Sequence, residues 1–114
     1  MSADCLFCKI VAGTIPARRV YEDELCLCFA DINPQAPTHL LLISKEHIPS
    51  TAQTEEKHGP LLGHLMVKAA AVARTAGLER GYRIVVNTGA DGGQTVGHLH
   101  LHLLGGRHMT WPPG

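Results

Sequence analysis

Short stretches in which apolar and polar positions alternate predict five β-strands along the chain. The first two are expected on either side of an acidic turn, and the last two are separated by a glycine-rich turn. The third is a purely apolar run, short enough to be a buried strand. In chain order, two strands fall within residues 18–30, and the others fall at 39–44, 82–87 and 98–104.

One segment, residues 60–76, carries its apolar side chains at helical spacing. Pro60 suits the first turn of a helix, where backbone N–H groups have no partner within the helix, and Gly77 is placed to end it in a left-handed conformation. Gly63 disfavours the helix by about 1 kcal/mol relative to Ala, which predicts close packing at that position. This order of elements indicates an α+β fold with a mainly antiparallel sheet.

The length and composition indicate one folded domain spanning residues 1–114. Apolar residues make up 45% of the chain and charged residues 18%, which excludes a disordered protein. Lys plus Arg and Asp plus Glu are balanced at ten each, and aromatic residues are too few for a track of stacked bases. We therefore expect a small-molecule ligand and no nucleic-acid partner.

The N-terminal residues lack the charged segment and long apolar run that are typical of a signal peptide. The longest apolar stretch, residues 40–43, is far shorter than the ~20 residues of a membrane span. Without an export signal, the four cysteines are expected in a reducing compartment, as free thiols or metal ligands. These features predict a cytoplasmic protein without a membrane partner.

Three histidines alternate with leucines over residues 98–104, which places His98, His100 and His102 on one face of a strand. A solvated strand face would more often carry Thr, Lys or Glu, so the row calls for a chemical explanation. One possibility is a metal site, although the Cα atoms of His98 and His102 would lie ~13 Å apart, which is awkward for one ion. The other is nucleophilic attack on phosphorus by an imidazole, which is largely neutral near pH 7.

The row matches the histidine triad motif, His-x-His-x-His-x-x with apolar x, and further segments extend the match. Together they resemble the histidine triad (HIT) superfamily, and in particular its Hint branch, over nearly the whole chain. The closing Trp-Pro-Pro-Gly favours Hint over the branch of dinucleoside polyphosphate hydrolases. The matching segments outside the triad are residues 31–39, 81–83, 86–87, 91–95, 105–107 and 111–114.

This resemblance implies a HIT-like fold, in which a mainly antiparallel five-stranded sheet carries one long and one short helix and the chain forms a two-fold homodimer. It implies that His100 is the nucleophile, with one ring nitrogen bonded to a backbone carbonyl and the other aimed at phosphorus. His102 and His39 would bind phosphate oxygens or relay a proton to the leaving amine, and the sequence does not say which is the acid. Taken alone, His39 could instead bond a loop carbonyl at a strand entrance.

The phosphate contacts that the resemblance implies are Asn87, Gly93, Gln94 and Thr95. Glycine allows close backbone approach to an anion, and amide and hydroxyl groups add hydrogen bonds. Taken alone, the Asp-Gly-Gly sequence at residues 91–93 would be a plain hairpin turn.

The nucleoside contacts that the resemblance implies lie elsewhere in the chain. Asp31 matches an acidic residue that accepts hydrogen bonds from both ribose hydroxyls, and Phe7, Ile10 and Ile32 match the apolar walls of the base slot. From the sequence alone, these three could equally be generic core residues. Trp111 either reaches the active site of the neighbouring subunit or anchors the tail as a partly buried residue.

The sequence Cys5-Leu6-Phe7-Cys8 has the spacing of a metal knuckle. The pattern does not favour a thioredoxin-like role, because no strand precedes this sequence and no βαβ unit follows it. Some HIT proteins complete such a site with two histidines, which here correspond to His47 and His98. The resemblance therefore implies a structural zinc ion on two thiolates and two imidazoles, with no cofactor required for catalysis.

The function implied is hydrolysis of a purine nucleoside phosphoramidate through a nucleotidyl-His100 intermediate, with a nucleoside monophosphate as product. Two alternatives remain at this point: a non-catalytic module that binds nucleotide or zinc, and a dinucleoside polyphosphate hydrolase. Cys26 and Cys28 are expected to be small buried apolar residues. Three other histidines, His58, His64 and His108, are expected on the surface or on a helix, without a role.

Overall fold

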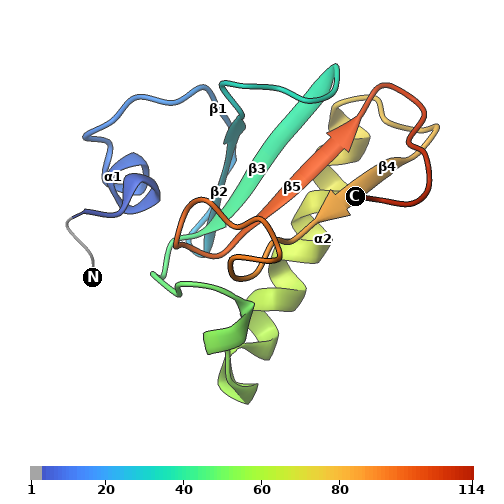
Figure 1. Ribbon diagram of the computed structural model, residues 1–114. Helices are drawn as coiled ribbons and strands as arrows, with labels where there is room; N and C mark the ends of the chain where they lie inside the picture. Colours follow the sequence, from blue (N-terminus) through green and yellow to red (C-terminus); the bar gives the residue numbers. More distant parts are fainter. Residues whose placement is uncertain (1–3) are drawn as a thin grey trace.

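A five-stranded antiparallel sheet with the strand order β1-β2-β3-β5-β4 forms the centre of the computed structural model, which describes residues 4–114 (Figure 1). The two α-helices belong to different faces of this sheet, and two short 3₁₀ turns precede the longer helix. The sequence-based prediction of an α+β fold with a mainly antiparallel sheet is confirmed. The elements are α1 (Leu6–Ala12), β1 (Arg19–Glu22), β2 (Cys26–Ala30), β3 (Thr38–Ser44), η1 (Thr51–Gln53), η2 (Glu56–His58), α2 (Gly59–Thr75), β4 (Tyr82–Val85) and β5 (His100–Gly105).

The acidic turn between β1 and β2 is held by a single carboxylate. Asp23 Oδ1 accepts hydrogen bonds from the backbone N–H groups of Leu25 (2.8 Å) and Cys26 (2.9 Å). Its Oδ2 accepts from Tyr21 Oη and lies 2.7 Å from Nε2 of His64 on α2. The turn is therefore also tied to the long helix.

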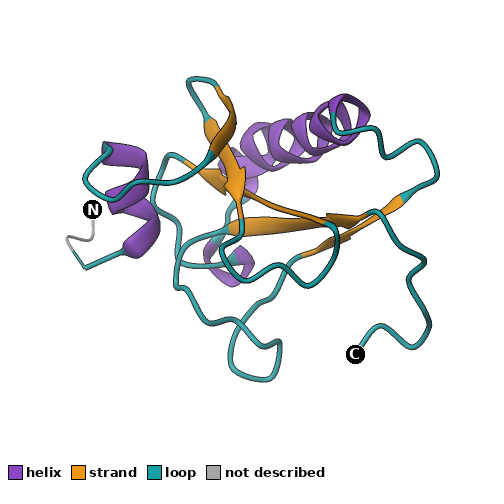
Figure 2. Ribbon diagram, turned by 90° about the horizontal axis from the view of Figure 1, so that it is seen from above, coloured by secondary structure: helices purple, strands orange, loops and turns teal. Residues whose placement is uncertain are grey.

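Helix α2 covers one face of the sheet (Figures 1 and 2). Pro60 stands in its first turn, and Gly77, with φ of 77°, follows its C-terminal end, as the sequence predicts. The prediction of close packing at Gly63 is wrong, because a Cβ built there would meet nothing within 4 Å and the residue is exposed. The residues that α2 buries are Leu61, Leu65, Ala69, Val72 and Ala73.

The two faces of the sheet belong to two separate apolar layers. Leu40 and Leu42 of β3 pack in the layer that contains α2, whereas Leu41 and Ile43 pack in the layer that contains α1. This division follows from the alternation of side chains along a strand, and it explains why residues 40–43 of β3 are apolar at every position. Helix α1 thus lies across the sheet from α2.

Several boundaries differ from the sequence-based predictions. Strand β4 ends at Val85 instead of 87, and β5 begins at His100, so His98 precedes the strand. His58 is buried (8% exposed), because its Nδ1 accepts the backbone N–H of Glu55 just before α2; the expectation that it has no structural role is wrong. Trp111 is 80% exposed and is therefore not a partly buried anchor within the described chain. Among residues 4–114, no helix combines the length and apolar character needed to cross a bilayer.

Candidate functional site

The alternation of the histidine-rich segment sorts its side chains onto opposite faces of the sheet. Leu99, Leu101 and Leu103 pack in the apolar layer of α2. The imidazoles of His100 and His102 lie on the α1 face, where their ring centroids are 5.0 Å apart. The predicted common face of the histidines therefore exists, although the first histidine lies outside the strand.

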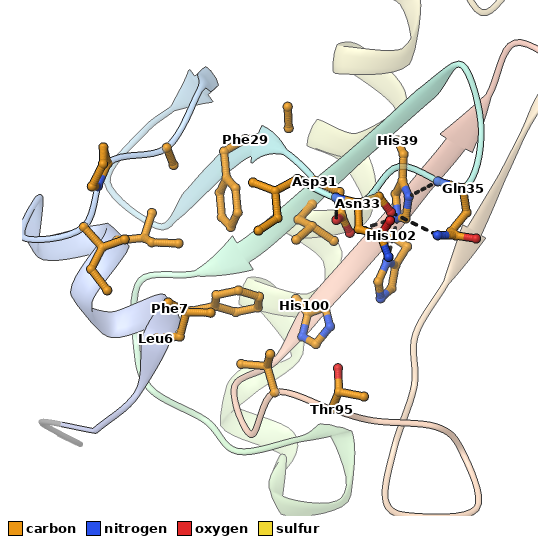
Figure 3. A pocket seen from close by; sticks show the side chains of 18 residues that line it. Leu6, Phe7, Phe29, Asp31, Asn33, Gln35, His39, Thr95, His100 and His102 are labelled. Carbon is orange, nitrogen blue, oxygen red and sulfur yellow. Dashed lines mark hydrogen bonds and ion pairs between the residues drawn. The ribbon is translucent and has the colours of Figure 1, made fainter.

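A cavity of about 440 Å³ opens on this face, between α1 and the loop that joins β2 to β3 (Figure 3). Its polar groups gather around the histidines, and apolar side chains line the part nearest α1. This combination of one polar and one apolar part suits a small ligand that has both characters. The lining residues are Leu6, Phe7, Ile10, Ile15, Pro16, Ala17, Phe29, Ala30, Asp31, Ile32, Asn33, Gln35, His39, Leu41, Thr95, Val96, His100 and His102.

The ring of His100 is oriented by a backbone carbonyl. Its Nδ1 donates to the carbonyl oxygen of His98 at 2.6 Å. A carbonyl can only accept, so the proton of a neutral imidazole is on Nδ1 and the lone pair is on Nε2. The residue is 5% exposed, and it lines the cavity. This arrangement leaves one nucleophilic nitrogen on a ring that faces the cavity.

His39 and His102 form a hydrogen-bonded pair whose direction is also fixed by the backbone. The backbone N–H of Gln35 donates to His39 Nδ1 at 3.0 Å, so this nitrogen is unprotonated and the proton of His39 is on Nε2. His39 Nε2 then donates to His102 Nδ1 at 2.9 Å. Consequently neutral His102 carries its own proton on Nε2. Burial, followed by the charges of His100 and His39, lowers the pKa of His102, which favours the neutral ring.

Asp31 stands beside this pair at the mouth of the cavity (Figure 3). Its Oδ1 accepts from the backbone N–H of Asn33 at 2.8 Å, and its Oδ2 lies 3.4 Å from His39 Nε2. The neighbouring Ile32 is fully exposed to solvent and also belongs to the residues that line the cavity. A carboxylate held in this way can accept hydrogen bonds from ligand hydroxyls.

The apolar part of the cavity includes the predicted residues Phe7 and Ile10, which are 4% and 5% exposed. Three further residues line this part and were not predicted: Leu41, Val96 and Phe29, whose ring lies 5.6 Å from that of Phe7 in an edge-on arrangement. Phe29 and Leu41 read as ordinary core residues in a strand pattern. Only the three-dimensional structure distinguishes a residue that lines the cavity from one that is buried in the core.

The loop of residues 87–96 contributes one of its four predicted phosphate contacts to the cavity lining. Thr95 lines the cavity, whereas Asn87, Gly93 and Gln94 do not. Asn87 Nδ2 donates to the carbonyl of Gly92 at 2.7 Å. Gln94 Nε2 donates to the carbonyls of Pro49 (2.8 Å) and Val96 (2.9 Å). In this structure the two amides hold the shape of the loop that carries Thr95.

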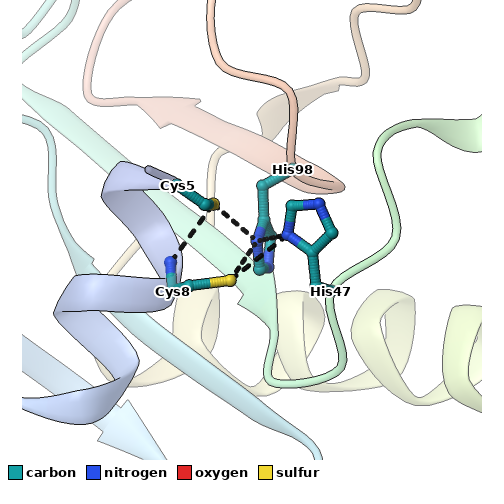
Figure 4. Close-up of side chains that lie close together, drawn as sticks. All are labelled: Cys5, Cys8, His47 and His98. Atoms are coloured by element: carbon teal, nitrogen blue, oxygen red, sulfur yellow. Dashed lines mark hydrogen bonds between the residues drawn. The ribbon is translucent and has the colours of Figure 1, made fainter. Parts of the chain in front are cut away.

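Cys5, Cys8, His47 and His98 lie together beside the cavity, as the resemblance implied (Figure 4). Each offers a ligand atom, and these four atoms all lie within 4.8 Å of one another. His98 Nδ1 is 3.2 Å from Cys5 Sγ, 3.6 Å from Cys8 Sγ and 3.2 Å from His47 Nδ1. His98 Nε2 donates to the Ser44 carbonyl at 2.6 Å, which leaves Nδ1 as the lone-pair nitrogen.

This metal-ligand cluster (Cys5, Cys8, His47 and His98) fits a zinc ion in number, chemistry and spacing. Zinc bonds of about 2.3 Å to sulfur and 2.0–2.1 Å to nitrogen separate the donor atoms of a tetrahedron by roughly 3.3–3.8 Å. The contacts of 3.2–3.6 Å among the donors are close to that spacing. The carbonyl that accepts from the second nitrogen of His98 is the usual partner of a ligating imidazole. The cluster could therefore bind a metal ion.

A third cysteine near a histidine and a carboxylate has a simpler explanation. Asp23, Cys26 and His64 come within metal-binding distance of one another. The Asp23 carboxylate is already engaged in the turn and helix contacts described above. Burial, followed by the charge of Asp23, raises the pKa of Cys26 to about 12, so this residue is a thiol. The arrangement stabilises the fold.

Known proteins that are similar to this chain share its fold and include a zinc-binding protein. A family model described as HIT domain matches residues 12–109. The chain is 54% identical over its full length to an uncharacterized HIT-like protein of Synechococcus elongatus, which it covers completely. It is 53% identical over 111 residues to a 14 kDa zinc-binding protein of Zea mays, with 96% of this chain and 87% of that one covered. A HIT family hydrolase from Legionella pneumophila superimposes with a TM-score of 0.96 at 54% identity, over 97% of this chain and 100% of that one.

Proposed function

Because the chain belongs to the HIT family, we propose that it is a hydrolase of purine nucleoside 5′-phosphoramidates, acting through a nucleotide covalently bound to His100. The observation that carries this proposal is the bond from His100 Nδ1 to the His98 carbonyl, because it leaves the Nε2 lone pair free on a ring that lines the cavity. An imidazole in this tautomer is a nucleophile suited to phosphorus at neutral pH.

In the first step, His100 Nε2 attacks the α-phosphorus and the P–N bond to the amine breaks. The nucleotidyl imidazole becomes positively charged, and the His98 carbonyl, which accepts the Nδ1 proton, stabilises this charge. His102 donates its Nε2 proton as a hydrogen bond to a phosphoryl oxygen, while His39 holds its other nitrogen. The neutral pair therefore orients and polarises the phosphoryl group.

In the second step, water attacks the same phosphorus and the bond to His100 Nε2 breaks. The nucleoside monophosphate then leaves, and the Nε2 lone pair is restored. In the first step the leaving amine takes up one proton from solvent, and in the second step the attacking water releases one proton to solvent. The enzyme therefore ends the cycle in the protonation state in which it began.

The nucleoside lies along the cavity from its polar to its apolar part. Asp31 accepts hydrogen bonds from the two ribose hydroxyls, and the base lies against Phe7, Ile10, Phe29 and the exposed Ile32. Thr95 adds a hydroxyl near the phosphate, with Asn87, Gly93 and Gln94 completing the phosphate contacts after a local adjustment of their loop.

The metal-ligand cluster would hold zinc, in line with the name of the zinc-binding relative from Zea mays. When bound, the ion supplies a fixed tetrahedral junction that joins the N-terminal segment to the segment preceding β5. We place the protein in the cytoplasm, a reducing compartment that suits its four cysteines, two of which belong to the metal-ligand cluster. We also propose that residues 1–114 form one domain and that it pairs as a two-fold homodimer in which exposed Trp111 approaches the partner's cavity.

Turnover of adenosine 5′-phosphoramidate, followed by release of AMP, tests this proposal. The wild-type protein should hydrolyse it in preference to diadenosine tetraphosphate. His100→Asn should lower kcat by at least about 10³-fold while AMP still binds, because the substitution removes the lone pair and keeps the shape of the site. If His100→Asn hydrolysed the substrate at the wild-type rate, the enzyme would use a different mechanism. If the wild type bound AMP and showed no hydrolysis, the protein would be a binding module.

A further inference from the structure

We propose that the metal-ligand cluster controls recognition of the base: when the cluster holds its metal, helix α1 is fixed as the apolar wall of the cavity, so metal and base-bearing ligand bind cooperatively. This inference rests on the proposed nucleotide-binding function. It goes beyond a metal that only stabilises the fold, because it couples metal affinity to ligand affinity.

Both halves of this coupling are carried by the same seven-residue helix. Cys5 caps α1 and Cys8 lies in its first turn, and both belong to the cluster. Leu6, Phe7 and Ile10 of the same helix line the cavity. A helix of two turns has little stability of its own, so its position depends on the contacts that hold it. Whatever fixes the two thiolates therefore also fixes the wall.

Phe7 is the residue through which the two sites touch. Its ring packs in T-shaped contacts against two imidazoles. The centroid of the Phe7 ring lies 5.8 Å from that of His98, a cluster residue, and 5.1 Å from that of His100. Phe7 also packs edge-on against Phe29 across the cavity lining. Phe7 is 4% exposed and cannot shift without disturbing all three rings. We assign it as a positioning residue between the cluster and the cavity.

The two ends of α1 are held differently. Near the C-terminal end, Arg19 Nη2 donates to the Ile10 carbonyl at 2.6 Å, which ties the helix to β1. At the N-terminal end, the Cys5 Sγ accepts the backbone N–H of Cys8 at 3.3 Å and is itself a cluster ligand atom. Loss of the metal should therefore loosen the first turn, where Leu6 and Phe7 lie, more than the last.

The phosphate end of the cavity depends less on α1, which touches it through the contact of Phe7 with the ring of His100. The segment of His98 to His100 is held by backbone bonds from Leu99 to Ile48 (2.7 Å) and from Ser44 to Leu99 (3.4 Å). The His39–His102 pair and Asp31 belong to β3, β5 and the loop between β2 and β3. The metal should thus affect binding of the base and leave binding of ribose and phosphate nearly unchanged.

Two ligands separate these ends of the cavity: AMP, which has a base, and ribose 5-phosphate, which lacks one. We expect removal of zinc by a chelator to weaken AMP binding at least about tenfold and to change ribose 5-phosphate binding less than about twofold. Cys8→Ser should reproduce this pattern, and Cys28→Ser, which removes a buried thiol from the opposite layer, should not. In turnover, zinc loss should raise KM much more than it lowers kcat.

Linkage provides a second measurement that starts from the folded, zinc-loaded protein. AMP should tighten zinc binding, measured by competition with a chromophoric chelator, by the same factor by which zinc tightens AMP. Ribose 5-phosphate at an equal multiple of its Kd should have no such effect. If zinc only prevented global unfolding, both ligands at equal saturation would protect the metal equally.

Equal protection by the two ligands, or equal AMP affinity with and without zinc in a folded protein, would overturn the coupling and leave the proposed function intact. Failure of the zinc-loaded protein to bind AMP at all would overturn both. A tenfold effect confined to AMP, with matching reciprocal tightening of zinc, supports the coupling.

Discussion

At the scale of single residues, backbone groups decide which nitrogen of each histidine carries the proton. The His98 carbonyl accepts from His100, the Ser44 carbonyl accepts from His98, and the Gln35 N–H donates to His39. In the proposed function, the same type of side chain thereby serves as nucleophile, metal ligand or hydrogen-bond donor according to its local backbone. Position in the strand alone does not define the role.

Neutral His102 predicts a definite dependence of stability on pH. Burial, followed by the charges of His100 and His39, lowers the pKa of folded His102, against a weaker opposing effect of Asp31. The unfolded chain takes up this proton below about pH 6.5, so the free energy of unfolding should fall from there through the folded pKa, by at most about 1.4 kcal/mol per pH unit. In His102→Gln, urea unfolding at pH 7.5 to 5.5 with saturating zinc should show a flatter decline.

The exposed His108 offers a matched control for this measurement, because His108→Gln should decline in parallel with the wild type. A decline in His102→Gln as steep as that of the wild type would show that His102 does not stay neutral in the folded protein.

The sequence predicted the residues whose chemistry is visible in a motif, and it missed those whose importance comes from position. The histidines and the Cys-x-x-Cys pair stand out because their side chains are uncommon in such patterns. Phe29 and Leu41 look like any strand residue, and only the cavity reveals them. His58 was misjudged because its partner, the backbone N–H of Glu55, comes from local geometry that the pattern does not encode.

At the scale of elements, the strand and helix types followed from periodicity, while their ends depended on contacts. β5 begins at His100, and the preceding His98 belongs to the metal-ligand cluster. Strand β4 ends at Val85, two residues earlier than predicted. The loop that follows is held by amide side chains of the loop itself, such as that of Asn87. The metal-ligand cluster joins residues that are far apart in the sequence, so the local pattern could not show where β5 begins.

Gly63 offers a direct gain in helix stability. It is exposed in the interior of α2, and a Cβ there would meet nothing within 4 Å. Gly63→Ala should therefore raise the free energy of unfolding by about 0.5–1 kcal/mol, measured by urea unfolding, with unchanged turnover. A destabilised Gly63→Ala protein would mean that this face of α2 is covered in solution.

Replacing one glycine of the loop that carries Thr95 should lower stability, whereas replacing another should have no effect. A Cβ on Gly92 would overlap the backbone of Thr88, whereas one on Gly97 would meet nothing within 4 Å. Gly92→Ala should lower stability by about 1–3 kcal/mol and weaken AMP binding, because the loop must shift. Gly97→Ala serves as the control and should behave as wild type; equal effects of the two substitutions would contradict this account of the loop.

At the scale of the whole molecule, the sheet separates two layers with different tasks. The layer of α2 is an apolar core that supports the sheet, and the layer of α1 contains the cavity and the metal-ligand cluster. The row of alternating leucines and histidines predicted this division. The resemblance already assigned both base contacts and metal ligands to residues 5–10, but the sequence pattern did not predict that one short helix carries them, because that depends on how α1 docks.

Metal content tests this arrangement independently of any ligand. Purified protein should hold about one zinc ion per chain, measured by elemental analysis, because the cluster provides one complete set of four donors. Cys8→Ser should lose most of this zinc, and Cys28→Ser should retain it. Zinc well below one per chain in the wild type, after purification without chelators, would contradict the assignment.

The proposed mechanism requires that Nε2 of His100 forms a bond to phosphorus. Protein mixed rapidly with adenosine 5′-phosphoramidate, quenched in alkali and digested, can be analysed by mass spectrometry for an adenylyl group on each histidine. We predict this group on His100 early in the reaction and its absence in His100→Asn. Turnover by the wild type with no adenylyl group at any time, or with the group on another histidine, would contradict the account.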